Sequence, residues 1–145
     1  MTLPAPEPGL VFRYSYLWRS EFLAGREEGV KDRPCAIILV TQDGDGESVV
    51  TALPITHSAP ADPRYALEIP AITKQRLGLD AARSWVVFSE SNLFVWPGPD
   101  LRPLPGRDLS TVAVGFLPPN FFHALRERYS AAIEAQQPGL VSRTK

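Results

Sequence analysis

The chain has 145 residues, of which 44% are hydrophobic and 21% are charged, and its formal net charge is −1 at pH 7. This length and composition suit one globular domain with one core. The balanced charge excludes an overall positive field that would gather nucleic acid, so any phosphate-binding site has to be built locally.

The apolar segments of the chain are too short to suggest a membrane protein. The longest apolar run, residues 35–40, falls far below the roughly 20 residues that cross a bilayer. The N-terminal residues lack the basic and apolar segments of a secretory signal. The single cysteine, Cys35, lies inside the apolar run, where a free thiol behaves as a small buried hydrophobe. We therefore expect a soluble protein located in the cytoplasm.

The distribution of prolines and periodic segments predicts one domain with short extensions. Residues 1–9 carry three prolines and a glycine without periodicity, which is typical of a flexible N-terminal arm. Periodic segments then continue over residues 10–136, and we assign these to a single domain. Residues 137–145 show no pattern, and we expect a frayed tail.

The first periodic segment, residues 10–18, is rich in aromatic and β-branched residues and predicts a strand. Its alternation places Phe12, Tyr14 and Tyr16 on one face, and we expect Phe12 and Tyr14 to lie in the core. Residues 19–29 contain charged residues around two glycines without an apolar face, so the pattern predicts a mobile loop.

A buried strand is predicted to begin at Arg33. Pro34 lacks an amide hydrogen and disfavours a helical conformation for the residue before it, and an apolar run follows. Arg33 should therefore lie at the mouth of this strand with its guanidinium facing out of the core. Two Asp-Gly pairs within residues 42–47 predict a hairpin turn to a second strand over residues 49–57.

The remaining pattern predicts short strands with one helix in the middle and one at the end. Thr56 and His57 end the second hairpin strand, in which Pro54 indicates an edge or a bulge. The further predicted elements are strands over 65–69, 84–88, 92–96 and 110–116, a short helix within 70–79 and an amphipathic helix over 119–136. This order favours a mainly β fold with helices, built as a small, strongly bent sheet or barrel.

Arg33 is the strongest candidate for chemistry, because a guanidinium binds phosphate in a forked manner and stabilises charge that develops on phosphoryl oxygens. The alternative is a surface ion pair with Asp32 or Glu28. Thr56 offers a hydroxyl and His57 an imidazole, the side chain used most often as an acid or a base near neutral pH, although a β-former and a solvated histidine explain the same residues.

Aromatic and cationic residues near the first strand suggest a surface for single-stranded nucleic acid. Trp18 can stack on bases, with Arg19 and Lys31 nearby, although such aromatic residues more often lie in a core. Glu90 lies between two apolar strands, from which it can reach a site, but a polar turn gives the same pattern.

A metal site or another cofactor is not expected. Cys35, His57 and His123 show no ligand spacing for zinc. Asp43 and Asp45 suggest a calcium loop, but the stretch is too short and lacks the distal bidentate glutamate, so we interpret both as turn residues.

Several of these segments in this order resemble the MazF/PemK family of toxin ribonucleases. The resemblance rests on the aromatic first strand, the charged loop, Arg33-Pro34 and Leu53-Pro-Ile-Thr-His57. Residues 84–90 and 92–98 resemble the later strands of the PemK-like branch, and the similarity extends from about Gly9 to the C-terminal helix.

The resemblance implies a small SH3-like β-barrel that forms homodimers, cleaves single-stranded RNA without a metal and is neutralised by an antitoxin protein. The family's arginine and threonine match Arg33 and Thr56, which would act on the phosphate while the RNA 2′-hydroxyl attacks it. His57 and Glu90 are the candidate general acid and base. The candidate RNA-binding residues are Lys31, Trp18, Arg19 and Ser58. The alternative function is a non-catalytic SH3-like barrel that binds protein or nucleic acid.

Overall fold

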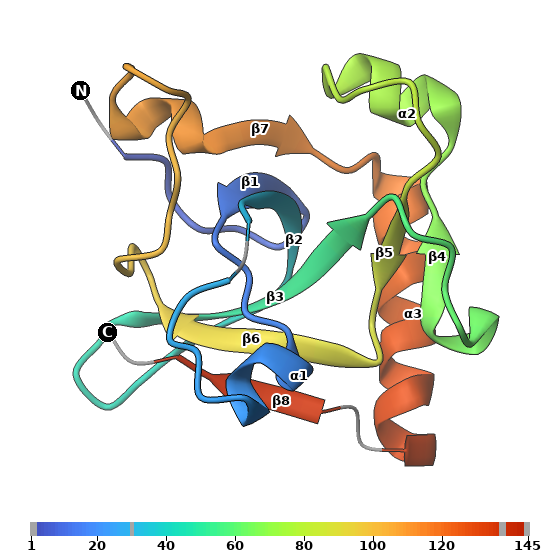
Figure 1. Ribbon diagram of the computed structural model, residues 1–145, viewed down its shortest axis with the longest axis horizontal. Coiled ribbons are helices and arrows are strands. Elements are labelled where there is room, and N and C mark those ends of the chain that lie inside the picture. The colour runs from blue at the N-terminus through green and yellow to red at the C-terminus, as the bar shows by residue number, and fades with distance from the viewer. Residues whose placement is uncertain (1–2, 30, 137–138, 144–145) are drawn as a thin grey trace.

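The computed structural model describes residues 3–29, 31–136 and 139–143. Over these residues the protein is mainly β, with one sheet and three α-helices (Figure 1). The strands are β1 Leu10–Tyr14, β2 Arg33–Gln42, β3 Ser48–Thr56, β4 Ala66–Glu68, β5 Trp85–Val87, β6 Glu90–Val95, β7 Ala113–Phe116 and β8 Gly139–Ser142. The helices are α1 Arg19–Leu23, α2 Ala71–Arg76 and α3 Pro119–Gln136, with 3-10 turns η1 Pro63–Tyr65 and η2 Leu109–Val112. None of these described helices is long and apolar enough to span a bilayer.

Strand β3 lies at the centre of the sheet and pairs with three other strands. It forms a hairpin with β2, while its first half pairs with β6 from Val49 to Ala52 and its end pairs with β5 at Ile55 and Thr56. Pro54 lies between these two partners and pairs with Cys35 of β2 on the other side. The prediction of a break or a bulge at Pro54 is wrong, because β3 runs through Pro54 and the irregular pairing with β2 lies farther along, between Ile37 and Leu39.

The sheet is open and bends around this change of partner. Its strand order is β4-β5-β3-β2-β1-β7; β6 pairs in addition with β3, and β8 pairs with β6. All pairs of these strands are antiparallel except β6 with β8. Within the part of the chain that the structure describes, no pairing joins β4 to β7. The predicted mainly β fold with helices is confirmed at this level.

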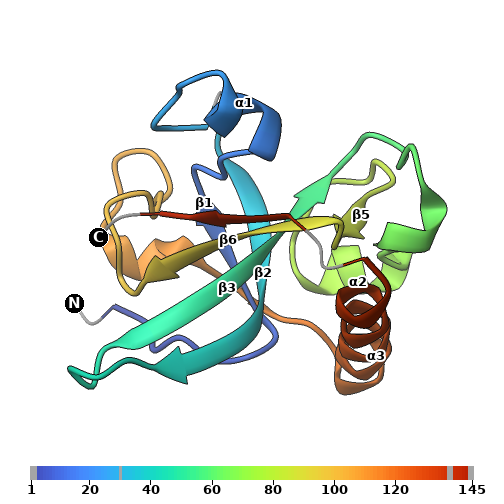
Figure 2. The ribbon, with the colours of Figure 1, turned by 90° about the horizontal axis from the view of Figure 1, so that it is seen from below.

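Both faces of the central strands are buried, which explains the continuous apolar run in β2. Cys35 and Ile37 face an aromatic cluster that includes Phe12 and Tyr14, as predicted for these two rings. Ala36 and the other alternate residues face a second cluster, which α3 covers with residues such as Leu125. Figure 2 shows α3 beside the sheet, and its bounds agree with the predicted helix over 119–136.

The prediction of a flexible arm over residues 1–9 is wrong for the described residues of this segment. Leu3 packs against the aromatic cluster, and the Trp96 indole Nε1 donates a hydrogen bond to the Pro4 carbonyl at 3.0 Å. The Gly9 amide also donates to the Ile37 carbonyl at 2.8 Å. Tertiary contacts therefore order a segment that has no periodicity of its own.

The prediction of a frayed tail over residues 137–145 is wrong for residues 139–143, and the others lie outside the described residues. Strand β8 pairs in parallel with β6, as Figures 1 and 2 both show. The Arg143 side chain is only 4% exposed, and its NH2 lies 2.7 Å from Oδ2 of Asp100. An ion pair with a residue far away in the sequence holds this segment, so local patterning could not reveal it.

The predicted mobile loop over residues 19–29 begins instead with the short helix α1. Its start is held because the Arg19 amide donates a hydrogen bond to Oε1 of Glu90 at 2.8 Å. Its far end returns to the residue that follows β1, since the Gly29 amide donates to Oγ of Ser15 at 3.1 Å. Both ends of the segment are thus tied to the sheet.

Gly29→Ala is expected to destabilise the protein by about 1–3 kcal/mol, as overpacking does in other proteins. A Cβ at this position would lie 2.0 Å from the Tyr16 carbonyl oxygen, so the backbone has to shift. Gly44→Ala is the control, because a Cβ there meets no atom within 4 Å. Urea denaturation of both variants measures the difference, and equal midpoints would contradict the close approach.

Candidate functional site

Arg33 and Thr56 lie side by side at one end of the central hairpin. Strand β2 begins at Arg33 and β3 ends at Thr56. Cys35 pairs with Pro54, and the same antiparallel register continued by about two residues places Arg33 opposite Thr56. Figure 2 shows α1 and the loop after β3 flanking this end of the sheet.

Two adjoining cavities meet at these two residues. One, here called the polar cavity, measures about 250 Å³ and is lined by Arg33 and Thr56 together with Lys31, Asp32, Pro34, Ile55, His57, Ser58, Lys74, Leu79, Asp80 and Ser84. The other, here called the aromatic cavity, measures about 420 Å³ and is lined by Arg33, Thr56, Ser58, Trp18, Ala59, Pro60, Ala61, Asp62, Tyr65, Val87 and Ser89. A ligand bound across both cavities therefore has to contact the Arg33 and Thr56 region.

Arg33 is positioned by an aromatic ring. Its Cζ lies 5.0 Å from the centroid of the Trp18 ring, and Tyr16 packs edge-on against that ring at 5.1 Å. The Arg33 Nε is buried and has no hydrogen-bond partner among the described residues. The guanidinium thus has a defined place and retains capacity to bind an anion.

Arg33 does not form the alternative surface ion pair with Asp32 or Glu28. Asp32 Oδ1 lies 3.4 Å from Nε of Arg102, and Glu28 Oε1 lies 3.9 Å from NH2 of the same residue. Both carboxylates that could have neutralised Arg33 therefore lie beside a different arginine. No carboxylate of the described residues is in ion-pair contact with Arg33.

Thr56 and Ser58 form the turn at the end of β3. Thr56 Oγ1 accepts a hydrogen bond from the Ser58 amide at 3.2 Å, which leaves the threonine hydroxyl hydrogen for another acceptor. Ser58 lines both cavities, and Lys31 lines the polar one. The structure thus brings Arg33, Thr56, Ser58 and Lys31 together.

The predicted acid-base residue His57 is the first of three side chains that contact one another in a row. Its Nε2 lies 2.7 Å from Oδ2 of Asp80, whose Oδ1 lies 2.7 Å from Nζ of Lys74. Lys74 is buried, although Asp80 and His57 are about half exposed. The hydrogen bond from Lys74 lowers the pKa of Asp80, so this carboxylate stays ionised.

Sequence reasoning did not identify Lys74 or Asp80. Lys74 lies in α2, which was predicted as a short helix, and Asp80 follows the turn at Gly78 that ends this segment. The polar residues of a short helix are usually solvated, so the sequence held no signal for a buried lysine. The cluster forms because Lys74 of α2 and His57, directly after β3, both contact Asp80.

Glu90, the other predicted acid-base residue, holds neighbouring segments together by hydrogen bonds. Its Oε1 accepts hydrogen bonds from the Tyr16 hydroxyl at 3.2 Å and from the Arg19 amide at 2.8 Å. Burial raises the pKa of its carboxyl group. Neither Glu90 nor Arg19 lines the two cavities, so the structure does not bring them together with Arg33.

Glu90→Gln is expected to make stability less dependent on pH. Because burial raises the pKa of Glu90, the folded protein binds more protons than the unfolded chain above the usual pKa of 4.5, and stability falls as pH rises through that window. Glutamine retains an acceptor oxygen but not the charge, so this fall disappears. Melting temperatures measured from pH 4.5 to 8 test this, with the exposed Glu134→Gln as control; parallel curves for wild type and Glu90→Gln would contradict it.

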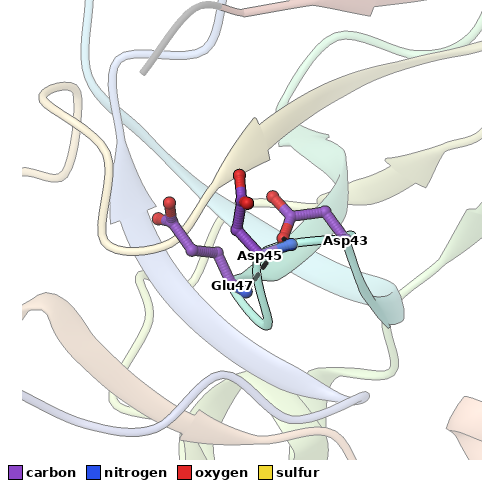
Figure 3. Close-up of side chains that lie close together, drawn as sticks. All are labelled: Asp43, Asp45 and Glu47. Carbon is purple, nitrogen blue, oxygen red and sulfur yellow. Dashed lines mark hydrogen bonds between the residues drawn. The ribbon is translucent and has the colours of Figure 1, made fainter.

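Three carboxylates gather at the opposite end of the hairpin, on the turn between β2 and β3 (Figure 3). One oxygen each from Asp43, Asp45 and Glu47 lie within 4.8 Å of one another. Asp43 Oδ1 accepts hydrogen bonds from the Asp45 and Glu47 amides at 2.8 and 2.9 Å. The interpretation of Asp43 as a turn residue is confirmed, and the turn accounts for the cluster.

The cavities combine groups that suit a phosphodiester. Arg33 supplies a positioned cation, Thr56 a hydroxyl, and His57 an imidazole paired with a carboxylate, and Trp18 with Tyr65 gives the neighbouring cavity aromatic walls. These groups can bind an anion and move a proton. Comparison with protein-family models found none that matches this chain, and comparison with curated proteins also found no match.

Proposed function

We propose that the protein is a metal-independent endoribonuclease of the MazF/PemK type that cleaves single-stranded RNA. The observation that carries this proposal is the Arg33 guanidinium, held on Trp18 beside Thr56 while its neighbouring carboxylates lie against Arg102. A cation arranged in this way is available for a phosphate group.

The reaction follows from the chemistry of these residues. The 2′-hydroxyl oxygen of the RNA attacks the adjacent phosphorus, the bond from phosphorus to O5′ breaks, and a 2′,3′-cyclic phosphate and a 5′-hydroxyl are formed. Arg33 stabilises the negative charge that grows on the phosphoryl oxygens, and the Thr56 hydroxyl donates a hydrogen bond to the same group. RNA bases stack against the walls of the aromatic cavity.

The proposal extends to the architecture and the partners. The bent sheet is a variant of the SH3-like barrel, the active protein is a homodimer, and a small antitoxin protein neutralises it. The order of the elements supports this, since a hairpin carrying Arg33 and Thr56 is followed by short strands and a long terminal helix. Sedimentation of the purified protein, alone and with the product of a neighbouring small gene, measures both associations.

Cleavage of chemically defined RNA tests the function. The purified protein is incubated in buffer that contains a metal chelator. Three substrates are compared in separate reactions: single-stranded RNA, the same RNA carrying 2′-O-methyl groups, and the corresponding DNA. We expect cleavage of the unmodified RNA alone, with cyclic phosphate ends, and loss of cleavage in Thr56→Val. Thr41→Val, on the same hairpin near the opposite turn, is the control.

The outcome of this experiment also decides between the proposed enzyme and the binding module. Tight binding of RNA or of a protein without any cleavage would overturn the enzymatic proposal in favour of a non-catalytic module. Cleavage of the 2′-O-methyl RNA would overturn the mechanism, because that substrate lacks the attacking hydroxyl.

A further inference from the structure

The contacts from Lys74 to Asp80 and from Asp80 to His57 have the geometry that orients the His57 imidazole. We propose that His57 is the general base of the RNA cleavage reaction and that Asp80, anchored by Lys74, positions its ring; this rests on the proposed function. Neither Asp80 nor Lys74 belongs to the residues that the family resemblance implies.

Asp80 is held in place by its first carboxylate oxygen. Oδ1 lies 2.7 Å from Lys74 Nζ and accepts a hydrogen bond from the Ala82 amide at 3.1 Å. Lys74 itself is 5% exposed and donates to Oγ of Ser84 at 2.6 Å and to the Ala82 carbonyl. The second oxygen, Oδ2, is thereby fixed at the point where it meets His57.

This contact determines which nitrogen of His57 can act as a base. An ionised carboxylate accepts only, so Nε2 of the ring carries a proton and donates it to Oδ2 across 2.7 Å. In the neutral ring Nδ1 is then the unprotonated nitrogen. His57 directly follows Thr56, and both line the polar cavity.

The proton balance of the reaction closes with these groups. The proton of the attacking 2′-hydroxyl passes to Nδ1 of His57, and the departing O5′ takes a proton from solvent water. The imidazolium then gives its proton to the hydroxide that this leaves, which restores the neutral base and the water molecule. Asp80 stabilises the imidazolium that forms, while Lys74, Lys31 and Arg33 oppose it and Asp32 adds a second negative charge on the cavity wall. The general base is expected to contribute about 10²–10⁴-fold to the rate.

Asp80→Asn tests the inference, since its side chain is about half exposed and the substitution preserves its shape. The asparagine amide can donate to Nε2, which moves the ring proton to Nδ1 and removes the base. We expect cleavage to fall at least about 10²-fold.

Nitrogen NMR of His57 provides a readout that does not depend on activity. The wild type and the conservative Asp80→Glu variant are expected to carry the proton on Nε2, whereas Asp80→Asn is expected to carry it on Nδ1. Glu68→Gln is the control, because Glu68 forms a bidentate ion pair with Arg83 on the surface. This control is expected to leave both the ring proton and the cleavage rate unchanged.

The outcomes separate the inference from the proposed function. An active wild type whose rate is the same in Asp80→Asn and Glu68→Gln overturns the positioning role while the enzymatic function stands. An unchanged rate in His57→Ala overturns the assignment of the base. A wild type that cleaves no RNA overturns both proposals, even when the ring proton lies on Nε2.

Discussion

Replacing Arg33 by alanine is expected to lower the rate of RNA cleavage by about 10²–10³-fold, the loss that follows when one preorganised donor to a developing oxyanion is removed. Arg33 is the cation that the structure holds beside Thr56 by packing on Trp18. The Nε atom of Arg33 has no hydrogen-bond partner among the described residues. Replacing Arg33 therefore leaves no other group without the hydrogen bond that this nitrogen would have made. The variant should therefore fold and still lose activity.

Arg83 provides a matched control for this substitution. Its Cζ lies 5.0 Å from the Trp85 ring centroid, the same separation as in the Arg33 and Trp18 pair, and it lines neither cavity of the site. Single-turnover cleavage by Arg33→Ala, Arg33→Lys and Arg83→Ala separates charge from geometry. Lysine keeps the charge without the planar fork, so partial activity is expected. Equal rates for Arg33→Ala and Arg83→Ala would contradict a role of Arg33 in the reaction.

Asp100→Ala is expected to lower the free energy of unfolding by about 3–5 kcal/mol, the cost of leaving a buried charge without its partner. The Asp100 and Arg143 side chains are 12% and 4% exposed. Arg143 also donates to the Asn92 side chain at 2.9 Å and to the Ser15 and Glu27 carbonyls at 3.2 Å. Loss of Asp100 therefore leaves a cation inside a network that ties β8 to β1 and β6.

Urea denaturation measures this effect, together with a variant that lacks both charges. Asp100→Ala combined with Arg143→Met removes the pair and should be more stable than Asp100→Ala alone. Glu68→Ala breaks an exposed ion pair with Arg83, and its unfolding midpoint is expected to change little. A single Asp100 variant as stable as Glu68→Ala would show that the tail is held by other contacts.

The candidate site was predicted in part, because its two strand-end residues have local causes. Pro34 forces an extended backbone at Arg33, and the apolar run after it requires burial, so the position of the guanidinium follows from adjacent residues. Thr56 follows from the same kind of argument on β3. Glu90 was placed wrongly beside these residues, since its hydrogen bonds to the end of β1 and the start of α1 depend on how β6 packs.

The sequence by itself determined the hairpin of β2 and β3, the terminal helix α3 and the position of Arg33 at the start of β2. Each of these follows from periodicity, proline and glycine chemistry within a few residues. Only the tertiary structure decided that Asp80 and Lys74 meet His57 and that Arg143 is buried against Asp100. These contacts join residues far apart in the chain, and charged residues carry no local signal of the partner that will neutralise them when they are buried.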